Sequence, residues 1–198
     1  MSIIGITGSF GSGKTVVANM FRQKRVKVLD ADRIAHDFMR SGNPCFKSIV
    51  SYFGEEVLKK GQIDRRILGD LVFRNKKYLK KLCSIVHPEV IKEIKNKIRF
   101  LKKNKRFKNI VMDVPLLFES GLDSLCDVIV VVKATQGKQI ERIQKKTDLT
   151  KSEILRRIRF QMPIQKKIQR ANCVIDNTKI FKQTKKQVED LCQEILNK

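Results

Sequence analysis

The segment that most constrains the fold runs from Gly8 to Thr15 and reads Gly-Ser-Phe-Gly-Ser-Gly-Lys-Thr. It satisfies the pattern G-x-x-x-x-G-K-[S/T], whose glycines let successive backbone N–H groups curl around phosphate oxygens. The apolar residues 2–7 before it predict a buried strand, and residues 16–21 after it continue as a helix. This context predicts a phosphate-binding loop (P-loop), with Lys14 on the β- and γ-phosphates of a nucleoside triphosphate and Thr15 on Mg²⁺.

The charge balance is the unusual part of the composition. In 198 residues, 43 Lys and Arg oppose 20 Asp and Glu, a formal net charge of +23. Such a balance fits a nucleic-acid partner, small polyphosphate ligands or lysines on solvated helix faces. No aromatic stacking platform accompanies the charge, so we do not expect a nucleic-acid partner.

The apolar stretches, cysteines and histidines indicate the cellular compartment in which the protein is expected. The sequence has no apolar stretch of 18 residues and no signal-peptide pattern, which predicts a protein without a membrane span. Its five cysteines are scattered without a C-x-x-C pair, and there are only two histidines. We therefore expect reduced thiols, no zinc site and a cytoplasmic location.

Four later apolar runs predict further strands, at residues 26–30, 109–115, 127–132 and 173–176. The run at 127–132 is β-branched and continuous, as in a parallel strand buried on both faces. Together with the first strand they predict an α/β protein with the P-loop NTPase fold, in which helices flank a five-stranded parallel sheet.

Carboxylates follow two of these strands. Asp30 and Asp32 end the second, and Asp113 ends the third in the Walker B arrangement, where a carboxylate holds a Mg²⁺-bound water. Ligands of such sheets bind beyond the carboxyl ends of the strands, so these groups are expected beside the P-loop. For the first two, the alternative is a surface turn with an Asp helix cap.

A helical block without a convincing strand lies between the second and third strands. Pro88 is expected to split its last run into two helices, because proline is tolerated at a helix start and not inside. An insertion at this rim is expected to bind the second substrate. His87 is either structural or functional, and Arg65-Arg66 either bind an anion or are solvated.

A strongly basic segment follows the fourth strand. Residues 138–170 contain eleven Lys and Arg against three acids, and Thr150 to Glu153 form a capping box that starts a helix. A cationic helical hairpin suits a lid that closes over triphosphate. A purely solvated face is the alternative. The chain is thus expected to form one unit with a core (1–32, 108–137, 171–198), an insertion (33–107) and a lid (138–170).

Three classes of P-loop protein are candidates. A GTPase should carry N-K-x-D and D-x-x-G, and a transport ATPase a signature such as L-S-G-G-Q, and all three patterns are absent. A small-molecule kinase needs a P-loop, a helical substrate-binding insertion and a cationic lid, and the sequence predicts all three.

The sequence resembles dephospho-coenzyme A kinases across essentially its whole length. The P-loop alone is shared by many functions, whereas the ordered combination of Asp-Ala-Asp, His-Pro and Pro-Leu-Leu-Phe-Glu is much narrower. The matching stretches are 7–15, 30–32, 65–66, 87–88, 115–119, Gln139 with Arg142, 157–161 and 174–177.

The resemblance implies transfer of the ATP γ-phosphoryl group to the ribose 3′-hydroxyl of dephospho-coenzyme A, with ATP and Mg²⁺ required. Asp32 would receive the hydroxyl proton, with Lys14 and Arg142 as the other catalytic groups. The residues expected to contact ATP are Gly8, Gly11, Ser12, Gly13, Lys14, Thr15, Val16, Arg142, Lys146 and Asn177. The residues expected at the acceptor are Asp32, Arg66, His87, Leu116, Phe118 and Glu119, and those at the metal are Thr15 and Asp113.

Two positions depart from the family pattern. Lys145-Lys146 stand where the lid commonly offers a second arginine, and Ala171-Asn172 where Ala-Asp commonly precedes the last strand. Ammonium matches the charge of guanidinium but not its planar fork, so the first departure bears on how the lid holds triphosphate. Another small-molecule kinase and a nucleic-acid-binding ATPase stay as alternative functions.

Overall fold

The computed structural model describes residues 2–24, 26–104 and 107–196. The chain divides into two compact units, Met1–Asp30 with Ile98–Lys198, and Ala31–Lys97. The first unit contains the P-loop, and the second contains most of the predicted helical insertion. The predicted segments also include residues 1, 25, 105–106 and 197–198, which lie outside the described part. The division into a core, an insertion and a lid stays a prediction about roles.

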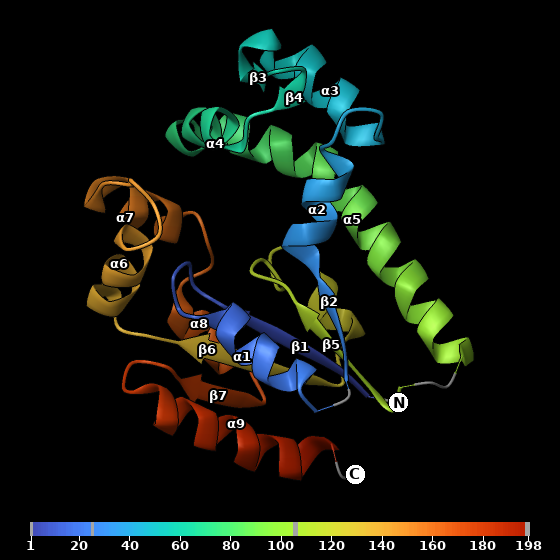
Figure 1. Ribbon diagram of the computed structural model, residues 1–198, viewed down its shortest axis with the longest axis vertical. Coiled ribbons are helices and arrows are strands. Elements are labelled where there is room, and N and C mark those ends of the chain that lie inside the picture. The colour runs from blue at the N-terminus through green and yellow to red at the C-terminus, as the bar shows by residue number, and fades with distance from the viewer. Residues whose placement is uncertain (1, 25, 105–106, 197–198) are drawn as a thin grey trace. The chain divides into compact units, whose positions relative to one another are not determined.

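The first unit is built on a five-stranded parallel sheet (Figure 1). Its strand order is β2-β5-β1-β6-β7, and all four neighbouring pairs are parallel. The strands are β1 (Ser2–Gly8), β2 (Lys27–Asp30), β5 (Asn109–Asp113), β6 (Val128–Lys133) and β7 (Cys173–Asp176). All five lie where the apolar runs predicted them, and the α/β fold class is confirmed.

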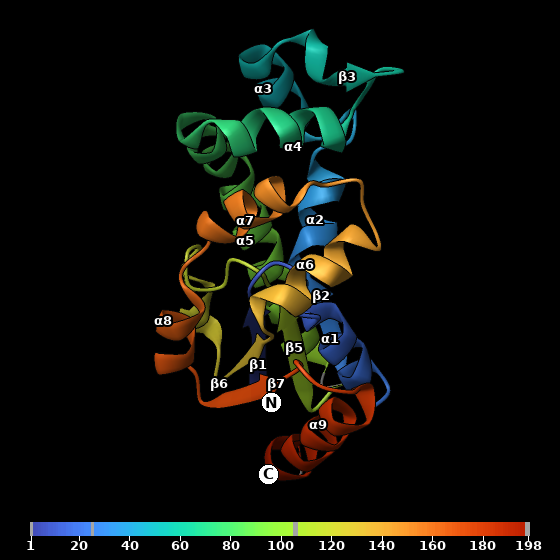
Figure 2. The same ribbon diagram turned by 90° about the vertical axis from the view of Figure 1, so that its left-hand side faces the viewer.

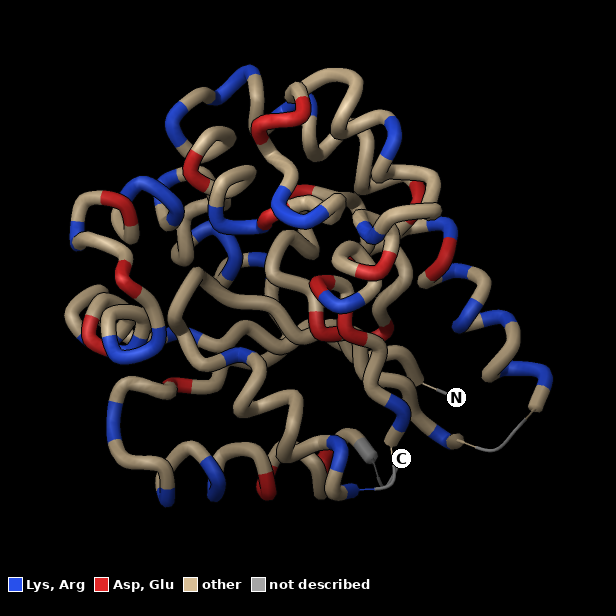
Figure 3. The backbone as a smooth tube through the Cα atoms, turned by 45° about the horizontal axis from the view of Figure 1, so that its top comes forward, with Lys and Arg blue, Asp and Glu red and all other residues tan. Residues whose placement is uncertain are grey.

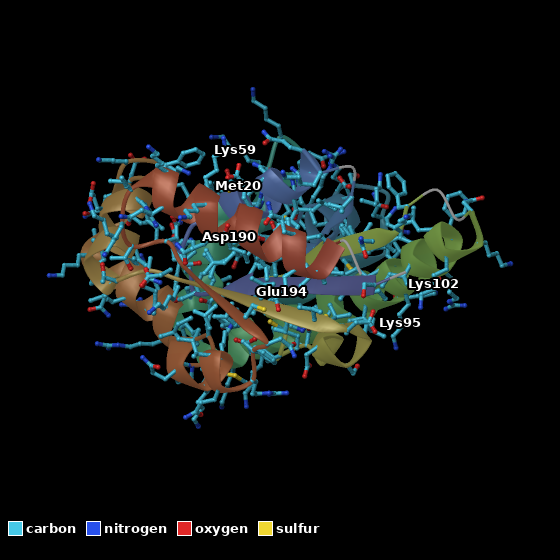
Figure 4. The ribbon with its side chains drawn as sticks, turned by 90° about the horizontal axis from the view of Figure 1, so that it is seen from below. Met20, Lys59, Lys95, Lys102, Asp190 and Glu194 are labelled. Atoms are coloured by element: carbon cyan, nitrogen blue, oxygen red, sulfur yellow. The ribbon has the colours of Figure 1, made fainter. Side chains whose placement is uncertain are left out.

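Helices cover both faces of this sheet. α1 (Lys14–Arg22) and α9 (Phe181–Leu196) lie on one face and α8 (Ile164–Gln169) on the other (Figure 2). The core between the sheet and the first pair includes Ile4, Ile6 and Phe21, each 0% exposed. Asp190 and Glu194 lie on the exposed face of α9, while Leu191 is buried in the core (Figure 4). A short 3₁₀ turn, η2 (Leu122–Leu125), precedes β6.

Two more helices of the first unit form the predicted basic hairpin. They are α6 (Gln136–Gln144) and α7 (Lys151–Arg159). The capping box predicted at the start of α7 is present: the Thr150 hydroxyl accepts from the Glu153 N–H at 3.3 Å, and Glu153 Oε2 accepts from the Thr150 N–H at 2.8 Å.

The second unit contains a hairpin that the sequence analysis missed. The elements of the second unit are α2 (Ala31–Phe38), α3 (Pro44–Phe53), the 3₁₀ turn η1 (Glu55–Val57), β3 (Leu58–Lys59), β4 (Gln62–Ile63), α4 (Arg65–Arg74) and the part of α5 (Lys76–Asn104) up to Lys97. The hairpin consists of β3 and β4. β3 and β4 pair antiparallel across Lys60 (φ 53°) and Gly61 (φ 71°), both in the left-handed conformation. The expectation of a strand-free insertion was therefore wrong. Strands of two residues are too short to produce an alternating pattern.

The prediction that Pro88 splits a helix was also wrong, since α5 runs through it without a break. Proline removes the donor that would bond to the Ser84 carbonyl, which weakens a helix at one position. Val86, Val90 and Ile94 on either side of it are 6%, 6% and 0% exposed. Packing of this buried face outweighs the single missing hydrogen bond.

The basic residues are dispersed over the helices, and the cysteines are not paired in disulfides. Lys and Arg positions are spread along the helices of both units (Figure 3). Each of the five cysteines is a free thiol. Within the residues that the structure describes, none of the helices combines the length and the apolar character that a bilayer crossing requires.

Candidate active site

The P-loop connects the carboxyl end of β1 to the N-terminus of α1. Gly11 and Gly13 have φ values of 78° and 86°, a conformation that favours glycine because it has no Cβ. A Cβ on Gly13 would also collide with the side-chain amide of Asn177. The N–H groups of Val16 and Val17 both bond to the Gly13 carbonyl, so α1 begins directly at the loop. Thr15 and Val16 are exposed in the first turn of α1.

Lys14 and Asp113 form a buried ion pair that joins the P-loop to the end of β5. The Lys14 ammonium donates to Asp113 Oδ1, and the two residues are 9% and 2% exposed. Burial raises the pKa of Asp113, the Lys14 ammonium acts against that rise, and the Asp30 carboxylate adds to it. Asp30 lies opposite Asp113 in the register of β2 and β5. The P-loop lysine and the carboxylate in the Walker B position thus lie together at the carboxyl ends of β1 and β5.

This pair leads to a prediction about stability. Because the Lys14 ammonium opposes the rise of the Asp113 pKa, Lys14→Ala should raise that pKa further. An unfolded Asp carboxyl has a pKa of about 3.9, so at pH values between that and the raised pKa the folded variant holds a proton that the unfolded chain has released. Its free energy of unfolding therefore falls as pH rises through the raised pKa.

Urea unfolding at about pH 5 and about pH 8 measures this effect, and the variant should lose more stability relative to wild type at the higher pH. In the double variant Lys14→Ala/Asp113→Asn the extra loss at the higher pH should disappear. An equal loss at both pH values in Lys14→Ala would contradict the assignment.

Asn177 and Arg142 form hydrogen bonds with the backbone of the P-loop. The Asn177 Nδ2 donates to the Ser12 carbonyl at 2.8 Å, and the Arg142 guanidinium donates to the same carbonyl at 3.3 Å and to the Asn177 carbonyl at 2.8 Å. The Thr184 hydroxyl donates to Asn177 Oδ1 at 2.9 Å. The structure thus brings two predicted nucleotide contacts onto the backbone of the loop itself. Thr184 is a supporting residue that the sequence analysis missed.

The basic hairpin contacts the tip of the P-loop. Gln161, just after α7, accepts the Phe10 N–H at 2.7 Å, and the Arg157 guanidinium lies 6.0 Å from the Phe10 ring centroid. These two residues were noted only as part of the family match, because nothing in the sequence pairs them with Phe10.

The lysines of the same hairpin are largely at the surface. Lys138 and Lys145 each donate to Glu141 at 2.9 Å, and together they lower its pKa to about 2. Lys146 is exposed in the turn after α6. Lys145 therefore fits the alternative of a solvated helix face, because it is exposed and forms an ion pair with Glu141 of α6.

The loop from Pro115 to Glu119 follows β5 and is held from two sides. The Thr7 hydroxyl donates to the Pro115 carbonyl at 3.1 Å, and the Lys167 ammonium donates to it at 2.8 Å. Lys167 also pairs with Glu119, with Nζ 3.0 Å from Oε1. Burial lowers the pKa of Lys167, and the Glu119 carboxylate acts against that shift. Sequence analysis missed Lys167 because it lies within a run of surface-like charges.

The predicted acceptor residues on this loop differ in exposure. Leu116 is half-buried, and Phe118 is 7% exposed beneath Arg170, whose guanidinium carbon lies 4.4 Å from the ring centroid. Arg170 also pairs with Asp123 at 2.7 Å. The aromatic ring is therefore fixed in place by the chain that leaves α8.

In the second unit, Asp32 is exposed in the first turn of α2, Arg66 is in the first turn of α4 and His87 lies inside α5. Asp64 caps α4, and its Oδ1 accepts from the Arg66 N–H at 2.8 Å.

The second unit also contains a cavity of about 240 Å³, which Asp32, Arg66 and His87 do not line. It is lined by His36, Met39, Arg40, Gln62, Ile63 and Arg65. The sequence analysis identified the Arg65-Arg66 pair. The family resemblance assigned Arg66 to the acceptor site, whereas Arg65 is the member that lines the cavity. His36 lies on α2 and Arg40 lies just beyond its end, and no sequence motif singled out either residue.

Donors for a divalent cation are hard oxygens at the P-loop. The Thr15 hydroxyl lies at the start of α1, and the Asp113 and Asp30 carboxylates end adjacent strands. In the part of the chain that the structure describes, no group of three His, Cys, Asp or Glu side chains is placed to hold a metal ion. This sparse oxygen set fits Mg²⁺, which usually keeps several waters and binds through one or two carboxylates together with substrate phosphates.

Comparison with known proteins extends these observations to the whole chain. The family model for dephospho-CoA kinase matches residues 2–183. The dephospho-CoA kinase of Lactobacillus johnsonii is 42% identical over 193 residues, which cover 97% of each chain. That of Bacillus licheniformis is 44% identical over 191 residues, which cover 96% of this chain and 94% of the relative.

A solved structure agrees with the sequence relatives. The dephospho-CoA kinase from Campylobacter jejuni matches with a TM-score of 0.69 at 28% identity, covering 98% of this chain and 96% of that one. The P-loop, the parallel sheet and the helical insertion all lie within these matches. The chain belongs to the dephospho-CoA kinase family.

Proposed function

We propose that the chain carries out phosphoryl transfer from ATP to the ribose 3′-hydroxyl of dephospho-CoA, giving CoA and ADP, through the residues described above. The observation that carries the assignment of the site is the buried Lys14–Asp113 pair at the P-loop. It joins the loop that binds phosphate to the strand end that supplies a metal-shell carboxylate, in a chain whose family performs this reaction.

The P-loop unit binds ATP in this proposal. Backbone N–H groups of residues 8–16 surround the phosphates, and Lys14 turns from Asp113 toward the β- and γ-phosphates. Arg142 and Asn177 hold the P-loop through hydrogen bonds to the Ser12 carbonyl. In this proposal both residues also lie beside the nucleotide. Lys146 supplies a point charge without the planar fork of an arginine. The transferred group carries developing negative charge, which these cations stabilise most when it is largest.

Magnesium would be held by Thr15 and Asp113 beside the phosphates. When bound, it neutralises charge on the β- and γ-phosphate oxygens. The chain's own contribution is to orient the oxygen donors: the start of α1 fixes the Thr15 hydroxyl and the parallel register fixes the Asp113 and Asp30 carboxylates.

Asp32 orients the acceptor hydroxyl and takes its proton late in the transfer. Asp32 lies exposed in the first turn of α2. A carboxylate is a weak base, which suits orientation of the hydroxyl better than early removal of its proton. The acceptor is held by Arg66, His87 and the loop residues Leu116, Phe118 and Glu119. We add Arg65 to this set, because it lines a cavity together with two other residues able to carry positive charge, His36 and Arg40. Such a cavity suits an anionic part of the acceptor.

Replacement of the acceptor residues tests this assignment. Arg65→Ala, Arg66→Ala and His87→Ala should each raise the KM for dephospho-CoA more than the KM for ATP, because they remove binding on one side of the reaction. The loss of a charged hydrogen bond corresponds to a rise of roughly tenfold or more for the arginines. Steady-state kinetics with each substrate varied in turn gives both constants. Arg74→Ala, at the other end of α4, serves as the control.

An equal rise in both KM values would make a tested residue structural. For His87 that outcome would agree with its position inside α5, directly before Pro88.

Thermal unfolding separates this function from its alternatives. A ligand that binds only the folded chain stabilises it by RT ln(1 + L/Kd), where L is the free ligand concentration, and so raises its melting temperature. Dephospho-CoA should stabilise the protein, whereas nucleosides, other kinase acceptors and an oligonucleotide at moderate salt should not. Stabilisation by the oligonucleotide alone would favour a nucleic-acid-binding ATPase instead. We place the enzyme in the cytoplasm, where ATP is available and five free thiols stay reduced.

A further inference from the structure

Lys167 is buried completely, although it lies in a strongly basic segment of the chain. Its side chain is 0% exposed, while the neighbouring Lys166 is exposed. Lysine is almost never fully buried unless its charge is paired, because removing an ammonium from water is strongly unfavourable. A solvated helix face therefore does not account for Lys167.

The ammonium group has three N–H donors, and three oxygens surround it. They are the Pro115 carbonyl at 2.8 Å, Glu119 Oε1 at 3.0 Å and Glu119 Oε2 at 3.4 Å. All three belong to the loop from Pro115 to Glu119. The Lys167 ammonium thus binds one loop through two hydrogen bonds and an ion pair, and it reaches that loop from α8, on the face of the sheet opposite α1 (Figure 2).

The chain around α8 reinforces the same contact. The Met162 N–H donates to Glu119 Oε1 at 2.7 Å, so Glu119 is held by two residues. Directly before it, Gln161 accepts the N–H of Phe10 at the tip of the P-loop at 2.7 Å. The adjacent residues Gln161 and Met162 therefore bind two loops, the P-loop after β1 and the Pro115–Glu119 loop after β5.

We propose that Lys167 is a positioning residue of the kinase site, which holds the Pro115–Glu119 loop in the conformation that receives the phosphoryl acceptor. This inference rests on the proposed function, in which Leu116, Phe118 and Glu119 contact dephospho-CoA. Lys167 itself contacts neither substrate, because it is fully covered by the protein.

Kinetic constants of Lys167 variants test the proposal. Lys167→Met keeps the length of the side chain and removes its donors, so it should raise the KM for dephospho-CoA at least about tenfold, the effect of losing a charged hydrogen bond. The KM for ATP should stay within about twofold, because the P-loop keeps its own Lys14–Asp113 and Asn177 contacts. Lys167→Arg, which keeps the charge and several donors, should restore much of the loss. The matched control is Lys166→Met, which should behave as wild type.

A purely structural role predicts other results. It predicts a lower melting temperature with unchanged constants for the folded fraction, or an equal rise in both KM values, and either result overturns the proposal. If Lys167→Met does not fold, Lys167→Gln replaces it under the same criteria, since it keeps an N–H donor for the Pro115 carbonyl. The wild-type enzyme separates the two hypotheses: if it does not phosphorylate dephospho-CoA, the proposed function fails, and if it does while the Lys167 variants match it, only the role of Lys167 fails.

Discussion

Lys14→Ala is expected to lower kcat/KM by about 100-fold or more, the usual effect of removing one preorganised charge from a phosphoryl-transfer site. Lys14 is the cation that the P-loop sequence places on the β- and γ-phosphates, and it lies at the start of α1, 9% exposed. Among the residues of the first unit that the structure describes, Lys14 is the cation that pairs with Asp113. The loss should therefore be in transition-state stabilisation rather than only in ATP affinity.

Steady-state kinetics measures this effect, with circular dichroism to verify that the variant is folded at the assay temperature. Lys24→Ala is the matched control, because Lys24 is exposed just beyond the other end of α1. A Lys14→Ala enzyme with near-normal turnover would show that the P-loop assignment is wrong.

Asp32→Asn should lower kcat by roughly 10²- to 10⁴-fold, the range for general acid–base groups, and leave the KM for ATP nearly unchanged. The amide has the shape of the carboxylate but cannot accept the proton of the acceptor hydroxyl. Asp32 follows β2 by two residues and occupies the exposed first turn of α2. A change there does not disturb a buried core, so the effect on stability should be small.

The control for Asp32 is another carboxylate of the same helix. Asp37→Asn removes a charge from the exposed end of α2, where Asp37 pairs with Arg40 at 3.5 Å. Wild-type kcat in the Asp32 variant would show that another group orients the hydroxyl, and equal losses in both variants would attribute the effect to α2 as a whole.

The elements that sequence analysis predicted correctly are those with a strong local pattern. β1, β5 and β6 are continuous apolar runs buried inside a parallel sheet, and such runs are visible without knowledge of their neighbours. The cap at Thr150 depends on a residue only three positions away. The Lys14–Asp113 contact could be anticipated because parallel strands present their carboxyl ends at one edge.

The features that were missed depend on contacts between distant parts of the chain. Pro88 stays inside α5 because buried neighbours on both sides hold the helix, and that burial is not a local property. Lys167 and Lys166 are indistinguishable in the sequence, yet only the first meets the Pro115 carbonyl and Glu119. Asn177 was expected to contact ATP from the family resemblance, and its hydrogen bond to Ser12 spans 165 positions of sequence.

The most direct measurement identifies the product formed from ATP and dephospho-CoA. The purified protein should convert the two, in the presence of Mg²⁺, to equal amounts of ADP and CoA, with the new phosphoryl group on the ribose 3′-oxygen as determined by mass spectrometry and ³¹P NMR. Lys14→Ala should form neither product at a comparable rate, and shikimate, nucleosides or an oligonucleotide should not replace dephospho-CoA. ATP turnover without phosphorylation of dephospho-CoA, or faster phosphorylation of another acceptor, would contradict the account.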